Sequence, residues 1–446
     1  MLTLTEISEQ HITGRIGELS TPSRLGIKTS LDPIQALLDR LGHPEREFPS
    51  IHVGGTSGKG STSTFLANIL QDAGYKVGLF TKPHLDSVRE RFVINGVPIG
   101  AEEIIDQIER IGKAEVVKPT WFELTTAIAF QYFAEAQVDF GVIEVGLGGK
   151  FDATNVIDPE LSILTNVGLD HTDVLGDTVE KIAADKVGIF KPGKPVVSGV
   201  VQPSVIEIVE KQSCAQQANL KLIGRDFGYS HVMLEECGSR FDFEMDGEDF
   251  QGITVSMMGK HQVVNASVAA AAALSLRKSG AIIPTSAIYS GLQRTRLPGR
   301  MEIFQNSHNI LLDGAHSPPK MEALAEGLRA LYTDRERVIG VLSFSQGHNA
   351  GATLASILPL LDTVILTEFD VETDYGNKRA QDPAIVAKLV RKLKPSVPLY
   401  LASDPTRALE MACSLAGAKD MICVTGSIFL VGEIRKYLCA NLKIAI

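Results

Sequence analysis

Residues 51–61 read Ile-His-Val-Gly-Gly-Thr-Ser-Gly-Lys-Gly-Ser, and this stretch decides the fold. An apolar, strand-like run at 51–53 enters a glycine-rich loop, and a helix-like segment at 62–70 leaves it. Glycines let backbone N–H groups crowd around phosphate oxygens, and a helix N-terminus adds partial positive charge. The layout is typical of a phosphate-binding loop, in which Lys59 serves the phosphates and the Ser61 hydroxyl serves Mg²⁺.

The spacing of this loop differs from the usual G-x-x-x-x-G-K-[ST] pattern, because Gly60 stands between Lys59 and Ser61. A glycine-rich structural turn is therefore the alternative to nucleotide binding. The strand–loop–helix context favours nucleotide binding, with seven residues in contact with the nucleotide: Gly55, Thr56, Ser57, Gly58, Lys59, Gly60 and Ser61.

Length and charge limit the classes of protein. The chain has 446 residues, 44% of them hydrophobic, which predicts two domains with sizeable cores. Its net charge of −10 argues against a general nucleic-acid binder, although a local basic pocket for an acidic small molecule is compatible with it.

Targeting signals and disulfides are not expected. The N-terminus lacks a basic segment followed by an apolar one, and no apolar run reaches the length of a membrane span. The five cysteines are scattered without a Cys-x-x-Cys pair, which indicates reduced, mostly buried thiols. We expect a cytoplasmic enzyme that does not bind membranes.

The first part of the chain alternates strand-like and helix-like segments, as in a doubly wound parallel sheet. Strands are expected at 77–81, 139–145 and 161–167, helices at 101–113 and 120–137, and a helix at 178–190 capped by Asp177. Alternating segments at 240–245 and 253–258 predict a small antiparallel sheet, and an Ala-rich helix follows at 259–276.

A domain boundary is expected at Leu297-Pro-Gly-Arg300, after which the strand and helix alternation restarts. We therefore predict an N-terminal domain at 1–297 and a C-terminal Rossmann-like domain at 298–446. The second domain should contain strands at 310–312, 338–342, 363–367, 398–401 and 421–424, and helices at 319–332, 383–394, 405–416 and 429–438.

Polar residues follow several predicted strands, where ligands bind in open α/β sheets. Glu144 ends one strand, and Asp170-His171 follows the next. Together with Ser61 they form a sparse ligand set suited to Mg²⁺, which keeps phosphate oxygens and water as further ligands. Asp313 and Arg300 hold comparable positions in the second domain. Helix caps, surface ion pairs and turns are the structural alternatives for all of these residues.

Six motifs in order resemble the folylpolyglutamate synthase/dihydrofolate synthase family of the Mur-ligase superfamily, from about residue 30 to the C-terminus. They are Gly55-Thr-Ser-Gly-Lys-Gly-Ser61, Glu144-Val-Gly-Leu-Gly-Gly-Lys-Phe-Asp-Ala-Thr-Asn155, Leu169-Asp-His171, Lys186-Val-Gly-Ile-Phe-Lys191, Leu297-Pro-Gly-Arg300 and Asp313-Gly-Ala-His316.

The resemblance implies an N-terminal P-loop ATPase domain with a parallel sheet plus a small antiparallel sheet, and a C-terminal Rossmann-like α/β domain. It implies an ATP- and Mg²⁺-dependent ligase that joins L-glutamate to a pterin-bearing carboxylate through an acyl phosphate. A usually monomeric enzyme is expected. Lys59, His171, Lys186 and His316 would be catalytic, and Lys186 matches a lysine that is carbamylated in the family. Asn265, Arg300 and Asp313 would hold ATP from the side opposite the phosphate loop.

The pterin side is implied by segments with weaker resemblance. Phe80-Thr-Lys-Pro-His-Leu85 and the Phe122 segment match the family near its folate pocket. Aromatic rings there could stack on a pterin, and arginine could meet a carboxylate; a basic loop over core phenylalanines is the alternative. The substrate set is Phe80, Thr81, Pro83, His84, Arg89, Phe122 and Asp152.

Three segments depart from the family pattern. Ser343-Phe-Ser-Gln-Gly-His-Asn349 lacks the family's Lys-Asp pair, Thr21–Lys28 follows the pattern loosely, and Lys150-Phe151 stands where Arg-Leu is more familiar. Two other functions remain open: a Mur-superfamily ligase with a different carboxylate acceptor, and an ATP-binding protein without ligase activity. A muramyl-peptide ligase is disfavoured, because only some 50 residues precede Gly54. The sequence does not choose between folate and dihydropteroate as acceptor.

Overall fold

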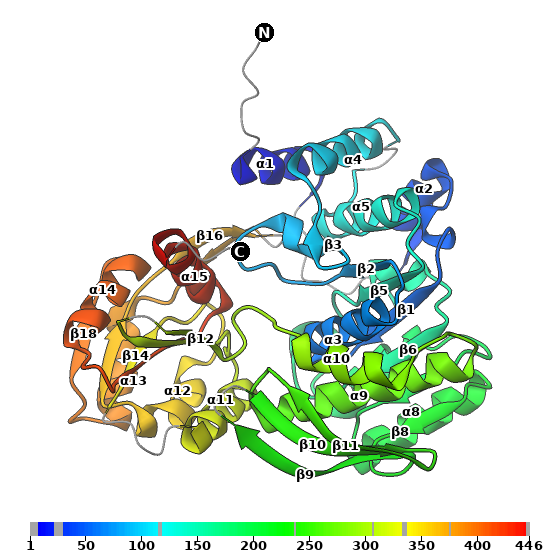
Figure 1. Cartoon of the computed structure of the whole chain (residues 1–446). Helices are drawn as coiled ribbons and strands as arrows, with labels where there is room; N and C mark the ends of the chain where they lie inside the picture. The colour runs from blue at the N-terminus through cyan, green and yellow to red at the C-terminus, as the bar shows by residue number, and fades with distance from the viewer. Residues whose placement is uncertain are drawn as a thin grey trace. The chain divides into compact units, whose positions relative to one another are not determined.

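The computed structural model describes residues 8–21, 30–114, 118–235, 238–305, 307–331, 337–373 and 376–442 (Figure 1). The chain divides into two compact units, one formed by residues 1–233, 240–256 and 261–295, and a second formed by 234–239, 257–260 and 296–446. The segment 22–28, Cys237 and Tyr332, which entered the sequence predictions, lie outside the described residues.

The first unit is built on an eight-stranded sheet with the order β4-β3-β2-β5-β1-β6-β7-β8. The strands from β2 to β8 in this order are parallel, and β3 and β4 are antiparallel additions at one edge. The bounds are β1 Ser50–Gly54, β2 Val77–Phe80, β3 Phe92–Ile94, β4 Val97–Pro98, β5 Phe140–Glu144, β6 Leu161–Leu164, β7 Val196–Ser198 and β8 Leu220–Leu222.

Strand β1 lies at the centre of this sheet, so it decides which loops meet. Val53 is in register with Glu144 of β5 on one side and with Ile163 of β6 on the other. Because these strands are parallel, the segments that follow all three leave from the same edge. Every residue of β1 is buried, as expected for a central strand covered on both faces.

Helices cover this sheet, and α3 (Lys59–Asp72) starts directly after the glycine-rich loop. The long helix α9 (Lys260–Lys278) is the predicted Ala-rich helix, and its Ala269–Ala273 run is completely buried. The remaining helices of the unit are α1 Glu9–Leu19, α2 Asp32–Leu41, α4 Ala101–Ala114, α5 Trp121–Glu135, α6 Thr172–Leu175, α7 Val179–Lys186, α8 Pro203–Ala215 and α10 Thr285–Arg294.

Two local predictions were wrong in their boundaries. Helix α7 is capped by Thr178, whose hydroxyl accepts from the Lys181 N–H, whereas Asp177 pairs with the Lys181 ammonium at 2.8 Å. The cap is the residue whose oxygen reaches the third helical N–H, and that is Thr178. The strand expected at 253–258 runs instead over Glu248–Val255 as β11. It forms a separate three-stranded sheet with β9 (Phe227–Glu235) and β10 (Gly238–Met245).

The second unit contains a six-stranded sheet with the order β12-β13-β19-β14-β15-β18, in which only β12 is antiparallel to its neighbour. Its strands are β12 Glu302–Gln305, β13 Asn309–Leu312, β14 Val338–Leu342, β15 Thr363–Leu366, β18 Leu399–Leu401 and β19 Met421–Thr425. A two-stranded hairpin of β16 (Asp370–Thr373) and β17 (Gly376–Arg379) follows β15 in the chain. Its helices are α11 Pro318–Leu331, α12 Ala350–Ile357, α13 Pro383–Leu393, α14 Pro405–Leu415 and α15 Ile428–Leu442.

The predicted fold class is confirmed: one α/β unit with a mostly parallel sheet and a small additional sheet, and a second α/β unit of Rossmann-like type. Helix α12 and the β16–β17 hairpin were missed. Helix α12 is short, and its start is set by the Asn349 side chain, which accepts from the Ala352 N–H. The sequence alone does not show that the Asn349 side chain turns back to the Ala352 N–H, because this depends on the path of the backbone before the helix.

Cysteine burial was predicted only in part. Of the four described cysteines, Cys423 and Cys439 are buried, but Cys214 is exposed and Cys413 partly so. No helix among the described residues is both long and apolar enough to cross a bilayer.

The packing of α10 on α3 generates a stability prediction (Figure 1). A Cβ at Gly291 of α10 would lie 2.6 Å from the Ile69 N and Cα atoms of α3, so the helix backbones would have to separate. We expect Gly291→Ala to lower the free energy of unfolding by about 1–3 kcal/mol, measured by urea denaturation. Gly17 of α1 is exposed, and nothing lies within 4 Å of a Cβ added there, so Gly17→Ala should raise the free energy of unfolding. Equal effects of both substitutions would contradict close α3–α10 packing.

Candidate active site

The glycine-rich loop is held in place by the segment that follows β6. The Thr165 hydroxyl donates to the Ser57 carbonyl at 2.6 Å, and the Ser57 N–H donates to the Asn166 side chain at 2.9 Å. The Thr56 N–H donates to the Asn166 carbonyl at 3.0 Å. Thr165 and Asn166 had no predicted role. Their position directly after β6, a strand that runs parallel to β1, could have indicated that they lie beside the loop.

Two lysine ammonium groups converge on one backbone oxygen. The Gly55 carbonyl accepts from Lys59 Nζ at 3.1 Å and from Lys186 Nζ at 3.0 Å. Lys59 begins α3, whereas Lys186 ends α7, 131 residues away in sequence from Gly55. Lys186 is only 5% exposed. The loop therefore gathers cationic donors beside the N-terminus of α3.

Nearby carboxylates oppose the effect of burial on the pKa values of the two lysines but do not outweigh it. Burial lowers the pKa of Lys59, and the carboxylate of Glu144, whose Oε1 lies 4.0 Å from Nζ, opposes the shift. Burial, followed by the charge of Lys59, lowers the pKa of Lys186 to about 7. Desolvated cations that repel each other are stabilised by an anion, so the site is suited to phosphate oxygens.

The predicted metal ligands approach the same loop. Glu144 is 3% exposed and its Oε2 accepts from the Lys82 N–H at 3.2 Å. Ser61 is buried in the first turn of α3. His171 is half-exposed, and its pKa is lowered by burial and, among other charges, by that of Lys82, a residue with no predicted role.

The predicted donor set suits Mg²⁺, because the protein supplies only a few of the ligands. Among the residues that the structure describes, no group of three His, Cys, Asp or Glu side chains forms a metal site. A hard cation at this place would need oxygen ligands from a bound phosphate and from water. Mg²⁺ has that preference, since it is commonly held by one or two carboxylates plus substrate phosphates.

Asn265 lies against the phosphate loop. A Cβ added at Gly58 would be 2.2 Å from Asn265 Oδ1, and Asn265 Nδ2 donates to Gln262 Oε1 at 3.0 Å. Gly58 and Asn265 belong to the first unit, whereas Arg300 and Asp313 belong to the second. The expectation that Asn265 acts from the side opposite the loop is therefore wrong, because α9 carries it to the loop itself.

The predicted pterin residues only partly come together. Phe122 is stacked on Phe80 with ring centroids 6.1 Å apart, and Lys82 Nζ lies 5.9 Å from the Phe122 ring. Phe80 is fully buried and serves the core. Arg89 pairs with Glu9 at 2.8 Å and donates to the Ile99 carbonyl, so its guanidinium is already engaged.

His84 is held in place by Arg91, which with Arg89 follows the same segment of the sequence. The Arg91 Nε–H donates to His84 Nδ1 at 2.9 Å, and the buried Arg91 guanidinium stacks over Trp121 at 4.6 Å. Burial, then the charge of Arg91, lowers the pKa of His84. Because Nδ1 accepts, the ring proton sits on Nε2, and His84 is a neutral donor. Thr81 and exposed Pro83 belong to the same segment after β2.

Asp152 is buried within a hydrogen-bonded chain. Its Oδ1 accepts from the Thr154 hydroxyl at 2.6 Å, and its Oδ2 accepts from the Leu147 N–H at 2.7 Å. The Thr154 oxygen in turn lies 2.8 Å from His52 Nε2 in the central strand. The carboxylate therefore has a fixed orientation, and it lies beside Phe122, since a Cβ at Gly146 would touch both side chains.

In the second unit, the segment after β13 forms a compact polar turn. Asp313 is buried and accepts from the Met301 and Ala315 N–H groups at 2.9 and 2.8 Å. His316 Nδ1 donates to the Gly314 carbonyl at 2.7 Å. Burial, followed by the charge of Lys320, lowers the pKa of His316 to about 3. His316, predicted to be catalytic, is thus neutral and holds no proton to donate from Nε2.

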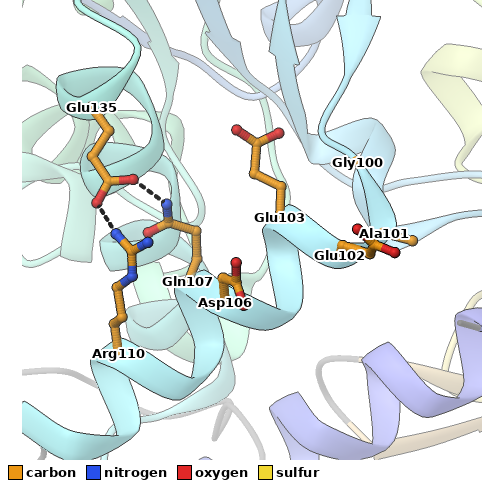
Figure 2. A pocket seen from close by; sticks show the side chains of 8 residues that line it. All are labelled: Gly100, Ala101, Glu102, Glu103, Asp106, Gln107, Arg110 and Glu135. Carbon is orange, nitrogen blue, oxygen red and sulfur yellow. Dashed lines mark hydrogen bonds and ion pairs between the residues drawn. The ribbon is translucent and has the colours of Figure 1, made fainter. Parts of the chain in front are cut away.

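A hollow of about 610 Å³ lies along α4, away from the predicted residues (Figure 2). Glu135 accepts there from Gln107 at 2.7 Å and pairs with Arg110. None of the residues predicted to bind or react lines it. Its charges serve the packing of α4 on α5.

Comparison with known proteins places this site in a class. The family model for the Mur ligase middle domain matches residues 53–273, and the model for the Mur ligase glutamate ligase domain matches residues 299–428. The first match includes the phosphate loop, Glu144 and Lys186, and the second includes Arg300, Asp313 and His316. The protein is a ligase of the Mur class.

Full-length relatives narrow the class. The chain is 33% identical to a dihydrofolate synthase/folylpolyglutamate synthase of Bacillus subtilis, over 98% of this chain and 100% of the relative. It is similar to the solved folylpolyglutamate synthase of Thermotoga maritima (31% identity, TM-score 0.83, covering 96% of this chain and 97% of the other). It is also similar to E. coli FolC solved in complex with DHPP and ADP (28% identity, TM-score 0.83, 97% and 98% coverage). The chain belongs to the folylpolyglutamate synthase/dihydrofolate synthase family.

The geometry of Gly58 generates a binding prediction. Gly58 has φ +81°, and an added Cβ would collide with Asn265. We expect Gly58→Ala to lower the affinity for ADP by roughly tenfold or more, because the loop must leave its left-handed turn. Isothermal titration with ADP measures this effect.

The matched control is Gly74→Ala at the end of α3. Gly74 also has a positive φ, +96°, but nothing lies within 4 Å of the added Cβ. It should lower the melting temperature without changing ADP affinity. Unchanged ADP affinity in Gly58→Ala would refute the phosphate-loop assignment.

Proposed function

We propose that the protein joins L-glutamate to the carboxylate of a folate, of dihydropteroate, or of both, while ATP is split to ADP and phosphate. The observation that carries the proposal is the convergence of Lys59 and Lys186 on the Gly55 carbonyl, beside buried Glu144. Such a site accommodates a transferring phosphoryl group, and a phosphoryl group is what converts a carboxylate into an acyl donor.

In the first step a carboxylate oxygen of the pterin substrate attacks the γ-phosphorus of ATP. The bond from that phosphorus to the bridging oxygen breaks, ADP leaves, and an acyl phosphate remains. The Lys59 ammonium and the N-terminus of α3 stabilise the charge on the phosphates. Lys59 is held by the Gly55 and Thr56 carbonyls, so it is oriented before the nucleotide arrives.

In the second step the neutral amine of L-glutamate attacks the acyl carbon. Phosphate leaves and the amine loses a proton, which gives the amide. On this proposal Phe122, Asp152 and the Nε2–H of His84 bind the pterin end, because the first offers an aromatic face and the others offer fixed polar groups. Arg300 and Asp313 act on the nucleotide or glutamate from the second unit.

Ser61, Glu144 and His171 would hold Mg²⁺ together with phosphate oxygens. When bound, the ion would offset negative charge on the transferring phosphoryl group. Glu144 is suited to this role because it is buried and already placed near Lys59.

We propose further that Lys186 is carbamylated. The ammonium would first lose one proton; the neutral amine nitrogen would then attack CO₂, forming an N–C bond and losing a second proton, so that a cation becomes an anion. A pKa of about 7 provides the uncharged amine that this step needs. The carbamate would also remove the repulsion between Lys186 and Lys59.

The working form proposed is a cytoplasmic monomer that uses small-molecule substrates and no nucleic acid, with the domain boundary at Leu297. The net charge of −10 supports the absence of nucleic acid. A ligase with another carboxylate acceptor is the second candidate. The predicted pterin residues come together less completely than the predicted phosphate residues do.

The first test is phosphate release from ATP with Mg²⁺ and L-glutamate, with dihydropteroate or tetrahydrofolate added separately. Turnover with dihydropteroate alone would indicate a dihydrofolate synthase, with tetrahydrofolate alone a folylpolyglutamate synthase, and with both a bifunctional enzyme. Folded, carbamylated protein that is silent with both would refute the folate proposal.

Substitution of Lys186 separates its possible roles. Lys186→Ala should lower turnover by roughly 100-fold or more, the order lost with one electrostatic group of an active site. Lys186→Arg keeps the cation but cannot form a carbamate, so it should be equally impaired. Near-normal turnover of Lys186→Arg would mean that only positive charge is required.

The carbamate itself predicts a dependence on pH and CO₂. With a pKa of about 7, the uncharged fraction of Lys186 rises from about a tenth at pH 6 to about nine-tenths at pH 8. Lowering the pH through 7 should therefore weaken a ¹³C carbamate NMR signal produced by ¹³C-bicarbonate. The signal should be absent from Lys186→Arg at either pH, and its absence from the wild-type protein at pH 8 would disprove carbamylation.

A further inference from the structure

A histidine without a predicted role lies in the middle of the first unit's sheet. His52 is the central residue of β1, in register with Ile143 of β5 and Ser162 of β6, and its side chain is completely buried. A buried polar side chain weakens a fold unless its polar atoms are hydrogen-bonded. Its Nδ1 has no hydrogen-bond partner in the described part of the chain. Packing alone therefore does not explain this histidine, since an apolar side chain would leave no unpaired nitrogen.

The other ring nitrogen begins a chain of hydrogen bonds with a fixed direction. The Thr154 hydroxyl donates its only proton to Asp152 Oδ1 at 2.6 Å. The same hydroxyl oxygen lies 2.8 Å from His52 Nε2, so it accepts there and the ring proton of His52 is on Nε2. Burial, opposed by the charge of Asp152, lowers the pKa of His52 to about 3, so the ring is neutral. The chain thus runs from His52 through Thr154 to the carboxylate.

The carboxylate at the end of this chain has one occupied oxygen and one that can still accept. Asp152 Oδ1 accepts from the hydroxyl and from the N–H of Thr154, the latter at 3.0 Å, which uses both of its lone pairs. Oδ2 accepts from the Leu147 N–H at 2.7 Å and keeps its second lone pair. A Cβ at Gly146 would lie 2.8 Å from Oδ2 and 2.4 Å from the Phe122 ring. The accepting oxygen and the aromatic ring therefore border the same small space.

We propose that His52 is a positioning residue for the acceptor substrate, and that through Thr154 it holds Asp152 so that Oδ2 accepts from an N–H or amino group of the substrate's heterocycle. The inference rests on the proposed function, in which Asp152 contacts the pterin end, and His52 itself does not touch the substrate. A carboxylate held in this way accepts in one direction only. It favours a ring with a donor at that place over a ring with a carbonyl there.

Substitution of Thr154 interrupts the chain. Thr154→Val keeps the shape of the side chain but removes the hydroxyl, so Asp152 loses a donor and its fixed orientation. KM for the pterin acceptor should rise roughly tenfold. The value of kcat and KM for ATP should stay near wild type, because the lost contact is remote from the reacting carboxylate and serves ground state and transition state alike. Thr154→Ser should restore most of the loss, and an unchanged acceptor KM in Thr154→Val would overturn the inference.

The matched control is Thr353→Val in the second unit. The Thr353 hydroxyl is buried and donates to the Asn349 carbonyl at 3.0 Å, so this variant also loses one buried hydrogen bond. Its melting temperature should fall as in Thr154→Val, while KM for the acceptor stays unchanged. An equal rise of acceptor KM in both variants would attribute the effect to lost stability and contradict the positioning role.

His52 needs its own pair of variants. His52→Gln offers an amide N–H near the place of Nε2, whereas His52→Met has no donor. The Gln variant should keep a lower acceptor KM than the Met variant, with similar kcat. Equal acceptor KM values would show that His52 does not act through Thr154. Because β1 leads into the phosphate loop, a rise in KM for ATP as large as the rise for the acceptor would indicate a distorted strand and overturn the inference.

A double substitution shows whether the chain acts through Asp152. Adding Thr154→Val to Asp152→Ala should raise the acceptor KM little further, because residues that act through one group are not additive. A second, independent increase of roughly tenfold would contradict the chain.

Ring ¹⁵N NMR tests the hydrogen-bond chain without turnover. The His52 signals, assigned by their loss in His52→Gln, should show a proton on Nε2 and none on Nδ1 from about pH 5 to 8, the range in which an ordinary histidine titrates. A proton on Nδ1 in this range would overturn the inference.

Wild-type protein that releases no phosphate with either acceptor would instead refute the proposed function. Isothermal titration with dihydropteroate would then decide the positioning role, since weaker binding to Thr154→Val than to wild type supports it and equal or absent binding to both contradicts it.

Discussion

The shared hydrogen bonds of Lys59 and Lys186 to the Gly55 carbonyl are the interaction on which the rest of the first unit depends. Two buried ammonium groups repel each other, and burial itself disfavours both charges. The chain tolerates this arrangement because Glu144 lies close to one of them and because the loop carbonyls accept from both. The two buried cations destabilise the fold locally, and a bound anion would relieve their repulsion. Phosphoryl transfer needs positive charge placed in this way before the nucleotide arrives.

The scaffold around that interaction is correspondingly rigid. Strand β1 is buried between two parallel neighbours, and α3 leaves it directly after the loop. The close approach of Gly291 to Ile69 fixes α3 from the other side, and Thr165 with Asn166 fixes the loop. The loop backbone is therefore held by its neighbours, and two of its N–H groups, those of Thr56 and Ser57, already donate to Asn166.

The second unit repeats the same physical device with different residues. A parallel strand ends, a polar turn follows, and a helix begins with a lysine in its first turn. Lys59 is held by carbonyl oxygens, whereas Lys320 is held by an imidazole nitrogen. The segment at Ser343–Asn349, which departs from the family pattern, supplies His348 to that turn.

The amino-acid sequence by itself determined the fold class, the phosphate loop and the order of the motifs, since these follow from local backbone geometry and hydrophobic periodicity. It also placed Glu144 at the end of a strand, whereas His171 lies beyond β6, at the start of α6. It could not give the depressed pKa of Lys186, the anchoring by Thr165 and Asn166, the position of Asn265 or the bond between His316 and Lys320. The first three depend on which strands and helices become neighbours, often across more than a hundred residues. The last depends on a ring tautomer that only the fold selects. Burial and hydrogen-bond partners are properties of the tertiary structure, and they decide whether a lysine is a surface charge or part of a site.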